Sequence, residues 1–192
     1  QLGRGVSPDK IQKCLQNRPR MAHREIHCVE YEWGQVILQE TADAQYTPYK
    51  DDGSLVGCVG RPRFLGGRQR DKVFCSRLND QWLGHSSQNS LLDSLTGMFA
   101  LLRVTHAQIS IIRDHMGTQP VYSAYTAAGD LVGIGTDVET LALIAGRDMD
   151  FDAISLGELL VHNSITFPFS SRQGIHEFEP GACVNISFHK GQ

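Results

Sequence analysis

Residues 95–125 decide the fold, and they read LTGMFALLRVTHAQISIIRDHMGTQPVYSAY. Two almost continuous apolar runs lie inside this stretch, one from Met98 to Val104 and one from Ile109 to Ile112. Apolar runs of this kind predict β-strands that are covered on both faces. The polar segment after the second run contains Gly117 and Pro120, which predicts a turn between two strands.

The chain on either side of this stretch predicts further strands and helices. Val121 to Tyr125 and Leu131 to Ile134 predict a hairpin, because a Gly-Asp turn separates them. Thr136 and Glu139 then match the capping-box pattern of a helix start, and Gly146 predicts the end of that helix. The other predicted elements are a helix from Ser7 to Pro19, a strand from Ile26 to Leu38 with a bend at Tyr31–Gly34, a turn at Lys50–Gly53, a strand from Leu55 to Val59, a helix opening at Asn89 or Ser90, a helix from Asp152 and a half-buried strand from Val184 to Phe188.

The composition is that of an ordinary globular protein. The 192 residues are 41 % hydrophobic and 20 % charged, which is enough apolar material for a buried core. No internal repeat or low-complexity tract divides the chain. Residues 1–192 are therefore predicted to form a single α+β domain, with long antiparallel sheets and helices packed outside them.

Charge, hydropathy and cysteine content exclude several classes of protein. The net charge of −3 argues against a strongly basic nucleic-acid binder. No apolar run reaches the roughly 18 residues that a membrane-spanning helix needs. The five cysteines include no CxxC pair, which argues against a zinc ribbon or a disulfide framework. A reducing compartment, the cytoplasm, is therefore expected.

Four motifs, in order along the chain, resemble class II glutamine amidotransferase domains, as found at the front of asparagine synthetases. Residues 95–100 resemble the L-x-G-M-F-A strand of that family, and residues 113–122 resemble its R-D-x-x-G-x-x-P-L-Y turn. Residues 135–141 resemble the A-S-E-x-K-A-L helix start, and residues 174–181 resemble the G-I-x-x-L-x-P-G that closes the domain.

The resemblance implies a fold and a chemistry. The implied fold is that of the N-terminal-nucleophile (Ntn) hydrolases, a four-layer αββα sandwich of two stacked, largely antiparallel sheets between outer helices. In active members the first residue after removal of Met is Cys, which attacks the side-chain amide of glutamine while its own α-amino group acts as base. The released ammonia travels to an ATP-using synthetase domain. ATP and magnesium are therefore expected on a partner domain, in the same or a separate polypeptide, and no cofactor on this one.

Three features depart from the active members that this chain resembles. Residues 1–5 resemble the segment after the Cys strand, so that strand is expected either upstream of Gln1 or to be missing. Where the family has N-G-E-I-Y-N, this chain has Val59-Gly60, which leaves only the Gly60 amide to stabilise an oxyanion. The family's Arg and Asp for binding glutamine find no match, and Asp80 is the candidate substitute.

Several other residues could carry either chemistry or a purely structural role. Cys58 is the best-placed internal nucleophile, although a free Cys is usually a small buried hydrophobe. Arg113 and Asp114 satisfy a turn, or contact the following domain as the motif does in the family. Arg61 and Arg63 begin a basic run that is either a solvated loop or a contact with the partner domain or a phosphate-bearing partner. The remaining candidates are a metal site at His23, His27 and Cys28, the rest of the basic run at Arg68, Arg70 and Lys72, and a serine-hydrolase site at His85–Ser87 without a G-x-S-x-G elbow.

The sequence thus predicts an amidotransferase-like domain that has lost glutamine hydrolysis, as in the N-terminal domains of β-lactam synthetases and lasso-peptide cyclases. Such a domain would be the structural partner of a synthetase domain that carries a pyrophosphate-binding Ser-Gly-Gly-x-Asp-Ser loop, and it could form a homo-oligomer. Two alternatives stay open. One is an active glutamine-hydrolysing domain whose N-terminal Cys is not among these residues, and the other is a binding module for a small molecule or peptide.

Overall fold

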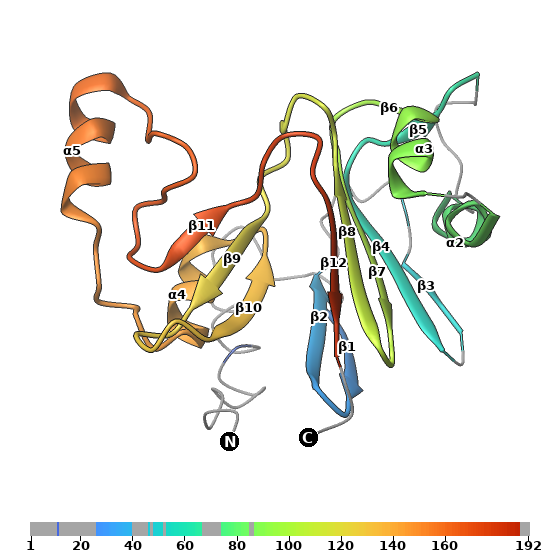
Figure 1. Cartoon of the computed structure of the whole chain (residues 1–192), viewed down its shortest axis with the longest axis horizontal. Helices are drawn as coiled ribbons and strands as arrows, with labels where there is room; N and C mark the ends of the chain where they lie inside the picture. Colours follow the sequence, from blue (N-terminus) through green and yellow to red (C-terminus); the bar gives the residue numbers. More distant parts are fainter. Residues whose placement is uncertain are drawn as a thin grey trace. The chain divides into compact units, whose positions relative to one another are not determined.

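The computed structural model describes residues 11, 26–39, 46, 48–51, 53–66, 74–84 and 87–188 (Figure 1). These residues fall into two compact units. Unit 1 comprises the described residues of 1–22 and 120–179, and unit 2 comprises those of 23–119 and 180–192.

Unit 2 is built on a five-stranded antiparallel sheet in the order β12-β8-β7-β4-β3. The central pairs join Gly60 to Phe99 and Ala100 to Arg113. The apolar run at residues 98–104 forms the middle strand, as the sequence predicts. The strands are β3 (Tyr49–Lys50), β4 (Ser54–Gly60), β7 (Phe99–Thr105), β8 (Gln108–Arg113) and β12 (Cys183–Ser187).

Two helices, α2 (Phe74–Gly84) and α3 (Gln88–Asp93), cover one face of this sheet. In α2 the residues Phe74, Leu78 and Trp82 recur every four positions and are buried, which is the spacing of one helical face. They pack with Val56, Leu101 and other buried residues of the sheet into one core cluster. A short ladder, β5 (Arg63–Phe64) with β6 (Leu95–Thr96), adjoins these elements in the chain.

The hairpin β1 (Ile26–Tyr31) and β2 (Gly34–Gln39) covers the other face of the sheet. Its Val36 packs with Leu55 and Val104, whereas the neighbouring Val56 belongs to the cluster under α2. Because successive side chains of a strand point to opposite faces, the two clusters lie on opposite sides of β4. Unit 2 therefore has a helical layer, a sheet and a second β layer.

The described part of residues 120–179 contains a three-stranded antiparallel sheet in the order β10-β9-β11 and the two helices α4 and α5. Helix α4 (Val138–Ile144) buries Leu141 and Ala142 against Ala124 and Ile175 of the sheet. Helix α5 (Ala153–His162) buries Ser155 alone among its residues. The strands are β9 (Tyr122–Tyr125), β10 (Leu131–Gly135) and β11 (Ile175–Glu177).

These elements confirm the mixed α+β fold with antiparallel sheets, and they correct two details. The predicted capping box is wrong: the N-cap of α4 is Asp137, whose carboxylate accepts a 2.7 Å hydrogen bond from the Thr140 amide, while Glu139 turns to Arg172. The structure also contains helix α2, which is not predicted from the sequence. The helix expected at residues 7–19 lies, except for Ile11, outside the described residues. No helix in the described part of the chain is long and apolar enough to cross a membrane.

Candidate functional site

One edge of the unit 2 sheet gathers residues that are far apart in the sequence. Strand β4 ends at Gly60, β7 begins at Phe99 and β8 ends at Arg113, and the register places these three positions side by side. The Asp114 amide donates a 3.0 Å hydrogen bond to the Phe99 carbonyl, which joins the end of β8 to the start of β7. The structure therefore brings together three sequence candidates, Gly60, Arg113 and Asp114.

Gly60 and Gly97 let two backbone segments approach each other at this edge. Gly60 has φ +90°, and a β-carbon on it would lie 2.2 Å from the Met98 carbonyl oxygen. Gly97 has φ +112°, and a β-carbon there would lie 2.2 Å from the Arg61 carbonyl oxygen. The Arg61 amide donates a 2.7 Å hydrogen bond to the Met98 carbonyl. The conformation requires glycine at both positions, because an L side chain has no room.

Asp114 is a buried carboxylate that accepts hydrogen bonds from three residues. Its oxygens accept from the Phe99 amide at 3.1 Å, the Met116 amide at 3.0 Å and the Thr118 amide and hydroxyl at 3.1 and 2.8 Å. Burial alone would raise the pKa of this carboxyl. The hydrogen bonds, those from Thr118 above all, outweigh burial and lower the pKa below its usual value. Asp114 is thus an ionised group that organises the turn.

Arg113 lies fully buried under the same turn. Its guanidinium donates to the Gln119 carbonyl at 3.0 Å and to the Gly117 carbonyl at 2.7 Å. Gly117 has φ +63°, as the turn predicts, and a β-carbon on it would meet Pro180 at 2.9 Å. The Gly181 amide donates to the Asp114 carbonyl at 2.9 Å. This RD loop, residues 113–119, therefore holds both the segment that leaves unit 2 and the one that returns to it.

Cys58 of β4 contacts Cys75 of α2, and the two Sγ atoms are 3.9 Å apart. The hydrogen bond with Cys58 and one from the Tyr49 amide lower the pKa of Cys75, although burial opposes this. The same contact, burial and the charge of Cys75 raise the pKa of Cys58. Cys58 therefore stays a neutral thiol at pH 7, and its neighbour in α2 is the stronger thiolate former.

Asp80 lies at the opposite end of β4 from Gly60. Helix α2 runs antiparallel to β4, since Cys75 contacts Cys58 while the next turn places Asn79 beside Ser54, with 3.4 Å between Asn79 Oδ1 and Ser54 Oγ. Asp80 is exposed on this distal part of the helix. The structure therefore does not bring the candidate glutamine-binding carboxylate next to the candidate oxyanion donor.

The four residues that could contact a partner domain differ in exposure. Arg61 is exposed and Arg63 is half-buried, whereas Arg113 is fully buried and Asp114 is 3 % exposed. The side chain of Val59 is 40 % exposed. Ser87 is the N-cap of α3, and its hydroxyl accepts a 3.2 Å hydrogen bond from the Ser90 amide, which is a structural role.

Within the described residues no group of three metal-ligating side chains forms a site. His23, Arg68, Arg70, Lys72, His85 and Ser86 lie outside the described residues, as does the side chain of His27.

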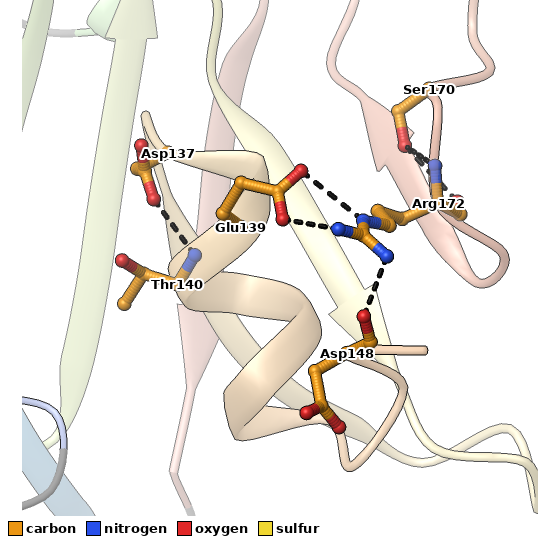
Figure 2. A network of polar contacts seen from close by, with 6 residues as sticks. All are labelled: Asp137, Glu139, Thr140, Asp148, Ser170 and Arg172. Atoms are coloured by element: carbon orange, nitrogen blue, oxygen red, sulfur yellow. Dashed lines mark hydrogen bonds and ion pairs between the residues drawn. The ribbon is translucent and has the colours of Figure 1, made fainter. Parts of the chain in front are cut away.

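Unit 1 carries a polar network that the sequence did not reveal (Figure 2). Arg172, 8 % exposed, holds both carboxylate oxygens of Glu139 and donates to the Asp148 carbonyl at 2.6 Å. Its guanidinium also lies 3.8 Å from the centre of the Phe151 ring. Glu139 is too far from Arg172 in the sequence for their pairing to be read from spacing. The network ties α4 to the segment before β11.

The segment from Met149 to Phe169 exposes an unusual number of large apolar side chains. Leu160 is 87 % exposed and Ile154 is 78 % exposed, although the helical pattern alone would place both in a core. The loop after α5 is fixed, because the Thr166 amide and hydroxyl donate to the Glu158 carboxylate at 2.9 Å each. We call these side chains the α5 surface; its members are Met149, Phe151, Ile154, Leu159, Leu160, Val161, Phe167 and Phe169.

Comparison with known proteins adds one finding to this geometry. Residues 83–192 match the family described as glutamine amidotransferase domain. The match spans α3, the RD loop, the whole described part of residues 120–179 and β12. No curated protein matches the chain.

Proposed function

This chain belongs to the glutamine amidotransferase domain family, class II, and on that premise we propose that it is the amidotransferase-like domain of an asparagine-synthetase-like enzyme. In this proposal the domain does not hydrolyse glutamine. It acts as the structural partner of an ATP-using synthetase domain that forms an amide bond. ATP and magnesium bind to that partner, and the complex works in the cytoplasm. The four-layer Ntn sandwich is the proposed arrangement of the sheets and helices.

The loss of glutamine hydrolysis is inferred from the end of β4. An oxyanion is stabilised by donors that are already in place, and removing one typically costs roughly 100- to 1000-fold in rate. Val59 stands where the family has its Asn, and its apolar side chain cannot donate. Cys58 lies inside strand β4, so it has no free α-amino group to act as the base that an N-terminal nucleophile uses. Asp80 lies at the far end of the strand.

The α5 surface is the observation that carries the partner role. Eight large apolar side chains are exposed within residues 149–169, and exposed apolar side chains that gather in one place mark interaction sites in soluble proteins. Asp148 and Asp150 are exposed beside it, which favours a partner with basic residues around an apolar patch. The Thr166 amide and hydroxyl bind the Glu158 carboxylate, which ties the loop after α5 to the helix.

The partner role is tested by binding. The tagged chain is co-expressed with the synthetase polypeptide of its own organism that carries the Ser-Gly-Gly-x-Asp-Ser loop. We expect co-purification with this polypeptide. Leu160→Glu and Ile154→Glu should weaken the complex at least tenfold, which corresponds to about 1.4 kcal/mol. Leu83→Glu is the matched control, because Leu83 is an exposed leucine at the end of α2 and outside the α5 surface. A complex that tolerates both α5 variants would refute the docking role.

The loss of glutamine hydrolysis is tested separately. The complete protein is incubated with glutamine, with and without its synthetase partner, and glutamate and ammonia are measured. We expect no release above the uncatalysed rate. Release that a Cys-directed glutamine analogue abolishes would establish the active amidotransferase instead. Calorimetric titration with glutamine, asparagine and an acidic peptide distinguishes the binding-module alternative.

A further inference from the structure

The contact between Cys58 and Cys75 is the starting point of a second proposal, independent of the partner role. The two sulfur atoms are 3.9 Å apart, and they come from different elements, strand β4 and helix α2. A disulfide requires the sulfurs to approach by about 2 Å more. Cys28, by contrast, is an exposed thiol on β1, and Cys183 lies on β12, away from α2 in the strand order.

We propose that Cys58 and Cys75 form an oxidation site, which a peroxide converts from two thiols into a disulfide that joins β4 to α2. The overall step is balanced: two thiols and one hydrogen peroxide give one disulfide and two waters. Cys75 attacks a peroxide oxygen, which gives a sulfenic acid and one water. Cys58 then attacks the sulfenic sulfur, the S–S bond forms, and the second water leaves.

The surroundings of the two sulfurs assign these roles. Cys75 lies in the first turn of α2, where the helix dipole favours a thiolate, and it accepts a hydrogen bond from the Tyr49 amide. The hydrogen bond with Cys58 and that from the Tyr49 amide lower the pKa of Cys75, although burial opposes this. Cys58 is the resolving thiol because its sulfur lies 3.9 Å from that of Cys75, and its proton leaves with the sulfenic hydroxyl as water. Cys58 is half-buried whereas Cys75 is 1 % exposed, so the oxidant must be small enough to enter past Cys58.

The disulfide would link helix α2 covalently to strand β4 of the unit 2 sheet. Helix α2 covers one face of the five-stranded sheet, and Cys75 stands at the end of α2 nearest to Gly60. A covalent link closes the chain between residues 58 and 75, which restricts the unfolded ensemble. The oxidised protein should therefore unfold at a higher temperature than the reduced protein.

The test uses the complete protein. The reduced protein is treated with a small excess of hydrogen peroxide, alkylated, and digested without reductant for mass spectrometry. We expect the peptides of Cys58 and Cys75 to be cross-linked as the main product, and dithiothreitol to reverse the link. Oxidation should raise the melting temperature by roughly 5 to 10 °C. Cys58→Ser should abolish both changes, and Cys28→Ser should leave both intact.

Identification of the cross-linked peptides in the wild-type protein tests the proposal even if a variant fails to fold. Cross-linking that appears only in denaturant would overturn it. So would oxidation of Cys28 to acids while Cys75 keeps a free thiol, or a disulfide of Cys58 with any cysteine other than Cys75. A cross-link that forms without any rise in melting temperature would refute the coupling between α2 and the sheet.

Discussion

The backbone of Gly60 passes so close to Met98 that a β-carbon on Gly60 would lie 2.2 Å from the Met98 carbonyl oxygen. Gly60 and Met98 lie where the pairing of β4 with β7 ends. At the same edge of the sheet the Asp114 carboxylate accepts a hydrogen bond from the Phe99 amide. The close approach to Met98 requires glycine at position 60, the residue proposed above as an oxyanion donor. Its first role in this chain is to permit the fold.

Replacing Gly60 with alanine should therefore destabilise unit 2. The change places a side chain at φ +90° and against a carbonyl, and we expect a loss of more than about 2 kcal/mol in the free energy of unfolding. Urea denaturation followed by fluorescence measures this loss. Gly53→Ala is the control, because a β-carbon on Gly53 meets nothing within 4 Å. Equal losses in the two variants would contradict the close approach.

Asp114→Asn should destabilise the RD loop at neutral pH by about 1 to 3 kcal/mol, because one amide nitrogen would face the donors of Phe99, Met116 or Thr118. Thermal unfolding at pH 7 measures the loss. Asp130→Asn, at an exposed position in the β9–β10 turn, serves as the control and should change the stability little.

The pH dependence of stability should report the same carboxylate. Its pKa is lower in the folded than in the unfolded protein, so its stabilisation is present above the unfolded value of about 4 and is lost as pH falls through the folded value. We expect the wild-type protein to lose more stability than Asp114→Asn between about pH 5 and pH 2. Parallel pH profiles of the two proteins would contradict the assignment.

The ion pair between Arg172 and Glu139 should contribute modestly to unit 1. Arg172 is buried, but the Glu139 side chain is 52 % exposed, so solvent screens the pair. A double-mutant cycle with Arg172→Lys and Glu139→Gln should give a coupling energy of roughly 1 kcal/mol. Arg172→Lys alone should cost more than Glu139→Gln, since it also removes the contact with the Phe151 ring. A coupling energy of zero would show that the network in Figure 2 does not act as a unit.

Asp152 should stabilise α5 as its N-cap. The carboxylate accepts from the Ser155 amide at 2.8 Å, and hydrogen bonds from Ser155 lower its pKa. Asp152→Ala should cost about 1 kcal/mol, whereas Asp152→Asn should retain most of the stability. Because the pKa is lowered, the cap weakens as pH falls below about 4. Hydrogen exchange of the α5 amides measures both effects, and equal protection in the two variants would exclude a capping role.

The strands of unit 2 were predictable because their signals are local. The apolar run at residues 98–104 and the turn at Lys50–Gly53 specify β7 and the β3–β4 hairpin within a few residues each. The turn residues Gly117 and Gly146 both adopt positive φ, as their positions indicate. Such strands and turns depend on residues that are close together in the sequence, so the sequence alone predicts them.

The errors come from contacts between distant segments. The Thr136–Glu139 pattern predicts a capping box, but Arg172 competes for Glu139, and Asp137 caps the helix instead. The helix predicted from Asp152 forms, but the structure leaves its apolar side chains Ile154 and Leu160 exposed. The pairing of Cys58 with Cys75 is equally invisible in one sequence, since only the packing of α2 on β4 creates it.

The RD loop also has a topological consequence. Arg113 binds the carbonyl of Gln119, and Gly117 approaches Pro180, so the departing and the returning chain are clasped by the same few residues. Residues 120–179 are, in chain topology, a detour from a sheet whose strands β8 and β12 pair directly across it. That detour could be exchanged, enlarged or shortened by recombination without cutting a strand of the five-stranded sheet.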